Sequence, residues 1–359
     1  MTVENPHQAR VVDVSRPGRA LAVEIDGAEA AELLLSVATM GSEEDRDTYE
    51  LGAARIDELR ASTPPELLSA AGELLPGKGA AQLLGLVYTT PRPRTGAAFL
   101  EHLEATDPLE LRLHLLGYYT RSHHLAEPET IRRAAEGDVA ARAELLEAFS
   151  AYTDKCETTA RLLDLAPDEA KRALVDLLSD WHEHVLPRIA PDVAALAERD
   201  ARAKRELVRS VPPEQVVERL APGIQWVPGS DVDRVVLFPA YSPRPWVYMS
   251  EYERVKIFCP PIGLDRGEAT PDDPAELVRL YKALGDESRL KLLKRLQSGP
   301  VTLAEAAQVV GLAKSTTHHH LAILRQAGFV LIREDDDTYS LRTDLRPEPG
   351  ALLGRYLDS

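Results

Sequence analysis

Residues 284–330 carry the pattern that decides the fold of the C-terminal part of this chain. They read LGDESRLKLLKRLQSGPVTLAEAAQVVGLAKSTTHHHLAILRQAGFV. Gly299 and Pro300 end one helical pattern, since neither residue suits a helix interior. Thr302 and Glu305 then have the spacing of a capping box, in which each side chain satisfies a backbone N–H at the start of the next helix. The stretch therefore predicts several short helices joined by tight turns.

The turn at Gly311 is the sharpest of these corners. Glycine supplies the positive φ that a close helix-to-helix turn requires, and we expect Leu312 to fill the core beneath it. The helix after the turn is predicted over 314–327. Its expected inward face, at helical spacing, consists of Thr317, Leu321, Leu324 and Gly328. In the earlier predicted helix, 287–297, the expected inward residues are Leu290, Leu293 and Leu296.

Two alternating stretches, 329–334 and 338–343, predict a β-hairpin that turns at three aspartates, 335–337. A helix-turn-helix followed by such a hairpin is the pattern of a winged helix. In a unit of this kind, the second helix of the motif enters the DNA major groove. We therefore expect a DNA-binding domain over 275–359.

The outward face of the 314–327 helix is short and polar, which suits a groove about 12 Å wide. Near its N-terminus we expect three residues to read base edges: Ser315, His318 and His319. Three others are placed for phosphate contacts: Lys314, Thr316 and Arg325. Because the aspartates at the hairpin tip repel phosphate, either the hairpin stays off the DNA backbone or only two residues at its base, Arg333 and Arg342, contact it.

The charge distribution agrees with a local DNA-binding surface. The chain has 359 residues and a net charge of −16, which would resist general adherence to DNA. Between 277 and 333, however, nine Lys and Arg face three Asp and Glu, a local excess of about six positive charges. A basic segment on an acidic protein favours a site-specific binder.

This C-terminal quarter resembles the ArsR-type winged-helix repressors. The matching residues lie in four groups: Ala283–Asp286 with Ser288–Leu290, Gly311 and Leu312 with Ser315 and Thr316, His319–Leu321, and Leu324 and Arg325 with Ala327–Val330. The resemblance implies a homodimeric repressor that binds a palindromic operator and releases it when an inducer binds. It also implies that 275–284 and 350–357 pack at the dimer interface.

The chain departs from the metal-sensing members of that family. They carry a cysteine pair on the helix that corresponds to 302–310, where this chain has none. No histidine occurs over 351–359, so a second family metal site is unsupported as well. We expect no metal site and no cofactor, and an inducer of unknown identity.

The remaining three-quarters of the chain predict an α+β, mostly helical fold. Helical patterns dominate from 28 to 220, and a first strand over 20–26 is expected to pair with three later strands in a small antiparallel sheet. The later strands are expected at 235–238, 246–249 and 255–258. We predict a domain over 1–265 for dimerisation, ligand sensing or both, a linker over 266–274, and the winged helix after it.

Other features have two interpretations. The histidines at 318–320 diverge by about 100° each on a helix, so they cannot converge on one metal ion. His123 and His124 either line a pocket or end a helix. Aromatic residues between 226 and 252 either form the core of the sheet or line a ligand cavity beside it.

The function classes follow from these observations. Two cysteines far apart offer no disulfide framework, and neither an eighteen-residue apolar run nor a secretion signal is present, so we expect a cytoplasmic protein. No nucleotide-binding or hydrolase motif occurs, which argues against an enzyme. The alternative is an enzyme or protein-interaction scaffold that uses its winged helix for protein contacts.

Overall fold

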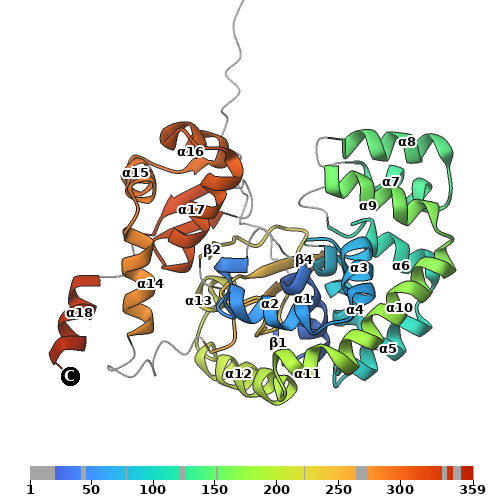
Figure 1. The fold of residues 1–359 in the computed structure, drawn as a ribbon, viewed down its shortest axis with the longest axis horizontal. Helices are drawn as coiled ribbons and strands as arrows, with labels where there is room; N and C mark the ends of the chain where they lie inside the picture. The colour runs from blue at the N-terminus through green and yellow to red at the C-terminus, as the bar shows by residue number, and fades with distance from the viewer. Residues whose placement is uncertain are drawn as a thin grey trace, which may run out of the picture.

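The computed structural model describes residues 21–41, 46–77, 79–120, 126–150, 153–221, 223–263, 274–333, 338–342 and 349–358. A helix-rich part with a small central sheet is followed by a compact C-terminal unit (Figure 1). The fold is α+β and mostly helical, as the sequence predicted. Among the described residues, no helix is both long and apolar enough to cross a bilayer.

Thirteen described α-helices, α1 to α13, make up most of the N-terminal part. The α-helices are α1 (Glu29–Gly41), α2 (Ala53–Ala61), α3 (Pro65–Leu74), α4 (Leu84–Thr89), α5 (Gly96–Ala105), α6 (Pro108–Leu115), α7 (Pro128–Ala135), α8 (Val139–Ala148), α9 (Thr153–Asp164), α10 (Pro167–His184), α11 (Leu186–Ile189), α12 (Val193–Leu207) and α13 (Val216–Leu220). Short 3₁₀ helices lie at η1 (Arg46–Thr48), η2 (Gly79–Leu83) and η4 (Pro213–Gln215). Helix α1 is buried almost throughout, so it forms the centre of the helical core.

The central sheet has the strand order β1-β3-β5-β4. Its strands are β1 (Ala22–Ile25), β3 (Arg234–Leu237), β4 (Tyr248–Tyr252) and β5 (Val255–Cys259). Val236 and Ile257 face the large helical core, while Val235 and Leu237 face a smaller core with α12 and α13. The sheet is therefore covered on both faces.

The first strand pairs with the later ones, as expected, but the expected antiparallel arrangement was wrong for most of the sheet. Strand β1 runs parallel to β3, and β3 runs parallel to β5. Only β4 and β5 are antiparallel, because a tight turn at Glu253 and Arg254 joins them. The other neighbours are separated by long connections, and these permit parallel pairing.

The C-terminal unit has its own core. It contains α14 (Ala275–Leu284), α15 (Glu287–Leu296), β6 (Val301–Thr302), α16 (Leu303–Val310), α17 (Lys314–Gln326), β7 (Val330–Arg333), β8 (Thr338–Leu341) and α18 (Pro349–Asp358). Leu280, Leu321 and Leu324 are buried in this core. In α15, Leu296 is buried and Leu293 packs against the core, as expected, but Leu290 is 50% exposed and Leu292 is buried instead.

Candidate nucleic-acid interface

Helices α16 and α17 form the helix-turn-helix. Thr302 caps α16 by accepting a hydrogen bond from the Glu305 backbone N–H at 3.3 Å, and the Glu305 carboxylate accepts from the Thr302 N–H at 2.8 Å. Gly311 ends the helix with φ 69°, the left-handed conformation expected for this corner. Leu312, by contrast, is 36% exposed, so the expectation that it fills the core was wrong.

Helix α17 has a buried side and an accessible side. Thr317, Leu321 and Leu324 are fully buried, which confirms the predicted inward face. The Thr317 hydroxyl donates to the Ala313 carbonyl at 2.9 Å, so this polar residue is satisfied inside the core. Because this side of α17 is buried, the other side faces solvent at the N-terminal end of the helix.

That accessible end carries most of the residues expected to contact bases and phosphates. Lys314 and Thr316 are exposed, and His318 and His319 are half-buried. The side chain of Ser315 lies outside the described part of the structure. No carboxylate belongs to α17, so the positive N-terminal end of the helix dipole adds to the Lys314 charge.

His320 has a different position from its two neighbours. Its ring nitrogen Nδ1 lies 3.6 Å from Asp286 Oδ1 and 3.3 Å from the Arg289 guanidinium. Burial lowers the His320 pKa, although the Asp286 carboxylate opposes this. Asp286 also caps α15 by accepting the Arg289 N–H at 3.0 Å. His320 therefore ties the middle of α17 to the start of α15.

Two of the arginines expected at DNA are held by the protein itself. Arg342 is 3% exposed, and its backbone N–H donates to the Phe329 carbonyl at 2.9 Å. A buried guanidinium cannot reach a phosphate, so the prediction for Arg342 was wrong. Arg325 is half-buried, and its guanidinium lies over the Trp246 ring, 5.2 Å from the ring centre. Its expected phosphate contact is corrected to a contact with the N-terminal part.

The Trp246 indole, against which Arg325 lies, is held in place by a hydrogen bond of its own. Trp246 Nε1 donates to the Thr48 hydroxyl at 2.9 Å, which orients the ring. A guanidinium over an indole face gains about 1–2 kcal/mol when the pair is partly desolvated. Burial lowers the pKa of the Arg325 guanidinium, but an arginine stays charged at neutral pH.

A short strand of the N-terminal part also joins the sheet of the winged helix. Strand β2 (Ile224–Gln225) pairs in parallel with β7, and the resulting sheet has the order β2-β7-β8-β6. The Ile332 N–H donates to the Gly223 carbonyl at 2.9 Å. The Ile332 side chain packs against both the C-terminal core and the smaller N-terminal core. We call β2, Gly223, Trp246, Arg325 and Ile332 the docking contact.

Sequence reasoning missed the docking contact because its signals are weak. Strand β2 has two residues, too few to show an alternating pattern. Gly223 has φ 79°, and a Cβ there would overlap the Arg325 side chain. A glycine flanked by apolar residues could have indicated that another segment lies close to the backbone at Gly223, but nothing in the sequence identifies that segment as the one with Arg325.

Several expectations fall outside the described residues. These are the linker over 266–273, the acidic hairpin tip over 334–337, and the histidine pair at 123 and 124. Arg333 lies on β7 opposite Gln225 of β2 and is half-buried, so it stays a predicted phosphate contact at the hairpin base.

Comparison with known proteins agrees with the geometry of the C-terminal unit. A helix-turn-helix domain family matches residues 284–333. The HTH-type transcriptional regulator NmtR of Mycobacterium tuberculosis is 32% identical over 71 residues, which cover 19% of this chain and 59% of that protein. The uncharacterized HTH-type transcriptional regulator YceK of Bacillus subtilis is 37% identical over 71 residues, 19% of this chain and 71% of that protein.

A probable mercury resistance operon repressor of Streptomyces lividans is 36% identical over 62 residues, 17% of this chain and half of that protein. The chain thus spans between half and about seven-tenths of the lengths of these relatives, and the matches leave its N-terminal three-quarters uncovered. No solved structure matches the chain. Through its C-terminal quarter, the chain belongs to the helix-turn-helix transcriptional regulators.

Proposed function

We propose that this DNA-binding transcriptional regulator is a homodimeric repressor that reads a palindromic operator through the N-terminal half of α17. The observation that carries the proposal is the accessible polar end of α17 over a fully buried opposite side. His318 and His319 offer hydrogen-bonding groups to base edges, while Lys314 and Thr316 contact phosphate. Arg333 adds a second phosphate contact from the hairpin base.

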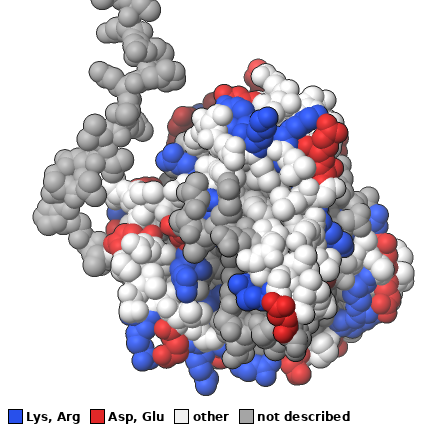
Figure 2. All heavy atoms as spheres, turned by 90° about the vertical axis from the view of Figure 1, so that its left-hand side faces the viewer, with Lys and Arg blue, Asp and Glu red and all other residues white. Residues whose placement is uncertain are grey.

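The dimer is proposed to form through the outer helices of the C-terminal unit. Exposed apolar side chains on this side are Val278, Tyr281, Leu290, Tyr356 and Leu357. Helices α14 and α18 pack together, and the Tyr281 hydroxyl lies 3.5 Å from the Pro349 carbonyl. Figure 2 shows this side of the molecule with charged side chains of both signs around a wide uncharged area. A second copy would cover that area and bring two copies of α17 to one duplex.

The N-terminal part is proposed to control the reading helix through the docking contact. Arg325 lies on the last turn of α17, and Ile332 lies on the strand that follows it. A shift of the N-terminal part would therefore move both the end of α17 and the hairpin. The docking contact supplies the physical connection that a sensing domain needs.

The first prediction concerns Lys314. We expect Lys314→Ala to weaken binding to the DNA upstream of the protein's own gene, because each protomer of the dimer loses one phosphate contact. The slope of log Kd against log salt should also fall by about 2. Fluorescence anisotropy across a salt series measures both. Arg209→Ala is the matched control, since it also removes one exposed cation, from the N-terminal part.

Equal slopes for Lys314→Ala and Arg209→Ala would remove Lys314 from the DNA interface. If the wild-type chain bound no DNA at about 50 mM salt, where phosphate contacts are strong, the protein-interaction scaffold would replace the repressor as the best account.

A further inference from the structure

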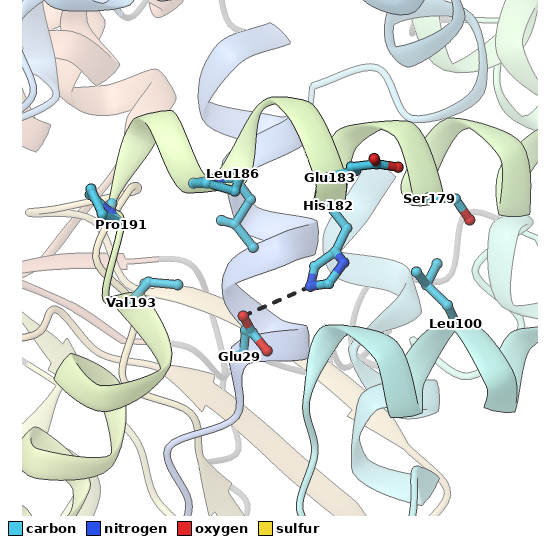
Figure 3. A pocket seen from close by; sticks show the side chains of 10 residues that line it. Glu29, Leu100, Ser179, His182, Glu183, Leu186, Pro191 and Val193 are labelled. Carbon is cyan, nitrogen blue, oxygen red and sulfur yellow. Dashed lines mark ion pairs between the residues drawn. The ribbon is translucent and has the colours of Figure 1, made fainter.

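A cavity of about 540 Å³ lies at the side of the N-terminal part. It is formed by the end of α10, by α11 and the start of α12, with the first turn of α1 and a residue of α5 opposite (Figure 3). This volume is in the range of sites for small organic ligands. None of the residues matched by the related regulators contributes to it.

The lining combines apolar walls with a few acidic and neutral polar groups. Leu100, Leu186 and Val193 supply apolar surface, and Ser179 supplies a hydroxyl. Glu29 lies inside with a side chain 21% exposed, whereas Glu183 lies at the rim with a side chain 76% exposed. No lysine or arginine is among the described residues that line the cavity. The charge of the lining therefore favours a cation over an anion.

The carboxylate of Glu29 is held so that one oxygen stays available. Its Oε2 accepts a hydrogen bond from the Gly96 N–H at 2.9 Å, at the first residue of α5. Its Oε1 lies 3.8 Å from His182 Nε2, which is beyond hydrogen-bond distance (Figure 3). A donor group of a ligand placed beside these two atoms would satisfy the free carboxylate oxygen.

The imidazole of His182 is positioned by the same glycine. A Cβ at Gly96 would overlap the His182 ring, so only glycine lets α5 approach this closely. His182 lies on the last turn of α10, and Ser179 lies one turn earlier on the same helix. The Glu29 carboxylate of α1 and the His182 ring of α10 thus face each other, with the Gly96 N–H of α5 at the other carboxylate oxygen, while Ser179 lies on the far side of the His182 ring (Figure 3).

We propose that this cavity binds a small amphipathic amine, with its ammonium group at Glu29 and its apolar body against Leu100, Leu186 and Val193. This inference rests on the proposed function, because it makes the amine the effector of the repressor. An ammonium donates up to three hydrogen bonds, which suits a carboxylate oxygen and an imidazole nitrogen, with the third donor left to water.

Helix α12 runs from the cavity to the residues that end the described part of the N-terminal unit. It begins at Val193 in the cavity wall, and its later turns carry a buried ion pair between Lys204 and Asp200. Asp200 Oδ1 accepts the Gly263 N–H at 2.8 Å, and Lys204 Nζ donates to the Pro261 carbonyl at 3.2 Å. These are among the last described residues before the segment that leads to α14.

Helix α12 is also in tight contact with the segment that carries Glu29. A Cβ at Gly27 would lie 2.5 Å from backbone atoms of Glu198, so the β1–α1 turn and α12 cannot move independently at this point. A ligand bound between Glu29 and Val193 would therefore contact both the segment that follows the β1–α1 turn and the start of α12. Its binding would change the position of α12 and of Pro261 and Gly263, which α12 holds and which precede the segment leading to α14.

The test uses the full chain and 4-phenylbutylamine as the probe, with 4-phenylbutanol as its neutral counterpart. Isothermal titration calorimetry should show saturable binding of the amine, at least about tenfold tighter than the alcohol. Glu29→Gln keeps an oxygen for the Gly96 N–H and should abolish that preference. Glu147→Gln, which removes an exposed acid of α8, is the matched control and should retain it. Leu100→Trp should abolish binding by filling the cavity.

A second measurement tests the effector role on DNA. The amine should change the operator Kd of the wild-type chain by about fivefold or more, and leave that of Glu29→Gln unchanged. Equal binding of amine and alcohol, no saturable amine binding, or an undiminished preference in Glu29→Gln would overturn the site. Amine binding without any change in operator Kd would overturn the effector role. The repressor proposal is tested separately: it fails if the wild-type chain does not bind DNA in the absence of the amine.

Discussion

His114 is a titratable side chain held inside the N-terminal core. It is 1% exposed, and its ring stacks on Tyr252 with ring centres 5.4 Å apart and an interplanar angle of 10°. Tyr119 lies 4.5 Å away on another side. Its Nδ1 faces the Gln82 carbonyl at 3.4 Å. Burial lowers the His114 pKa to about 4, so the ring is neutral in the folded protein at neutral pH.

This lowered pKa predicts a loss of stability in mild acid. Between pH 6.5 and pH 4 the unfolded chain binds a proton at His114 that the folded chain does not, so the free energy of unfolding falls as pH falls. The loss is about 3 kcal/mol over that range. His114→Phe should reduce the difference in unfolding free energy between pH 7 and pH 4.5, as measured in urea.

The comparison must be made between the two chains, since other groups titrate in the same range. Burial raises the pKa of Glu32, whose carboxylate accepts the Tyr241 and Ser242 N–H groups, and that shift acts in the opposite direction. The same pH dependence in the variant and the wild-type chain would contradict the assignment to His114.

Gly223 supports a second prediction at the scale of single residues. Gly223→Ala places a Cβ against Arg325 at φ 79°, so we expect the docking contact to loosen. The strain is of order 1–3 kcal/mol. Hydrogen exchange of the Ile332 amide, which donates to Gly223, should accelerate by about tenfold or more. Gly263→Ala is the matched control, because its φ is 80° and no atom lies within 4 Å of the added Cβ.

If Gly263→Ala accelerated the Ile332 amide as much as Gly223→Ala did, backbone strain alone would explain the effect, and the contact with Arg325 would not matter. The pair of variants therefore separates conformation from packing.

At the scale of elements, the local rules of the sequence predicted the reading unit well. The capping box of α16, the glycine corner and the buried face of α17 follow from side-chain chemistry within a few residues. In α15, Leu293 and Leu296 were predicted correctly, but Leu290 was assigned to the core in place of Leu292, because both are apolar and periodicity alone does not choose between them. Strand direction in the central sheet depends on connections of many residues, which local patterns do not encode.

The start of α16 carries a prediction of its own. Thr302→Ala removes the cap of the Glu305 N–H and breaks the reciprocal bond, so it should cost about 1 kcal/mol. Amides of the first turn of α16 should exchange faster in the variant. Thr316→Ala is the matched control, since Thr316 is exposed and caps no helix in the described structure. Protection unchanged by Thr302→Ala would show that packing, not the cap, holds this turn.

At the scale of the whole molecule, the candidate interface was predicted only in part. The accessible end of α17 agrees with the sequence, but Arg325 and Arg342 were assigned to DNA because an exposed arginine and a docked arginine look alike in sequence. Their positions are set by the N-terminal part and by the hairpin base. A contact between distant segments of the chain cannot be read from either segment alone.

The proposed dimer gives a prediction at this scale. Leu357 is 72% exposed on α18, and Leu357→Glu would bury a charge in the interface. We expect its dimer to dissociate at a concentration at least about tenfold higher, measured by analytical ultracentrifugation. Val139→Glu is the control, because Val139 is 80% exposed on α8. A Leu357→Glu chain that associates as tightly as the wild-type chain would place the dimer elsewhere.

The strand β2 has one more consequence, for how this protein can be divided. Because β2 pairs with β7 from more than a hundred residues away in sequence, cutting the chain before Ala275 would uncover an unpaired strand edge beside Ile332. Bare edges of this kind recruit other strands and promote aggregation. The DNA-binding module of this regulator therefore cannot be transferred to another protein by itself. A fusion protein would have to supply a strand that pairs with β7 in place of Ile224 and Gln225.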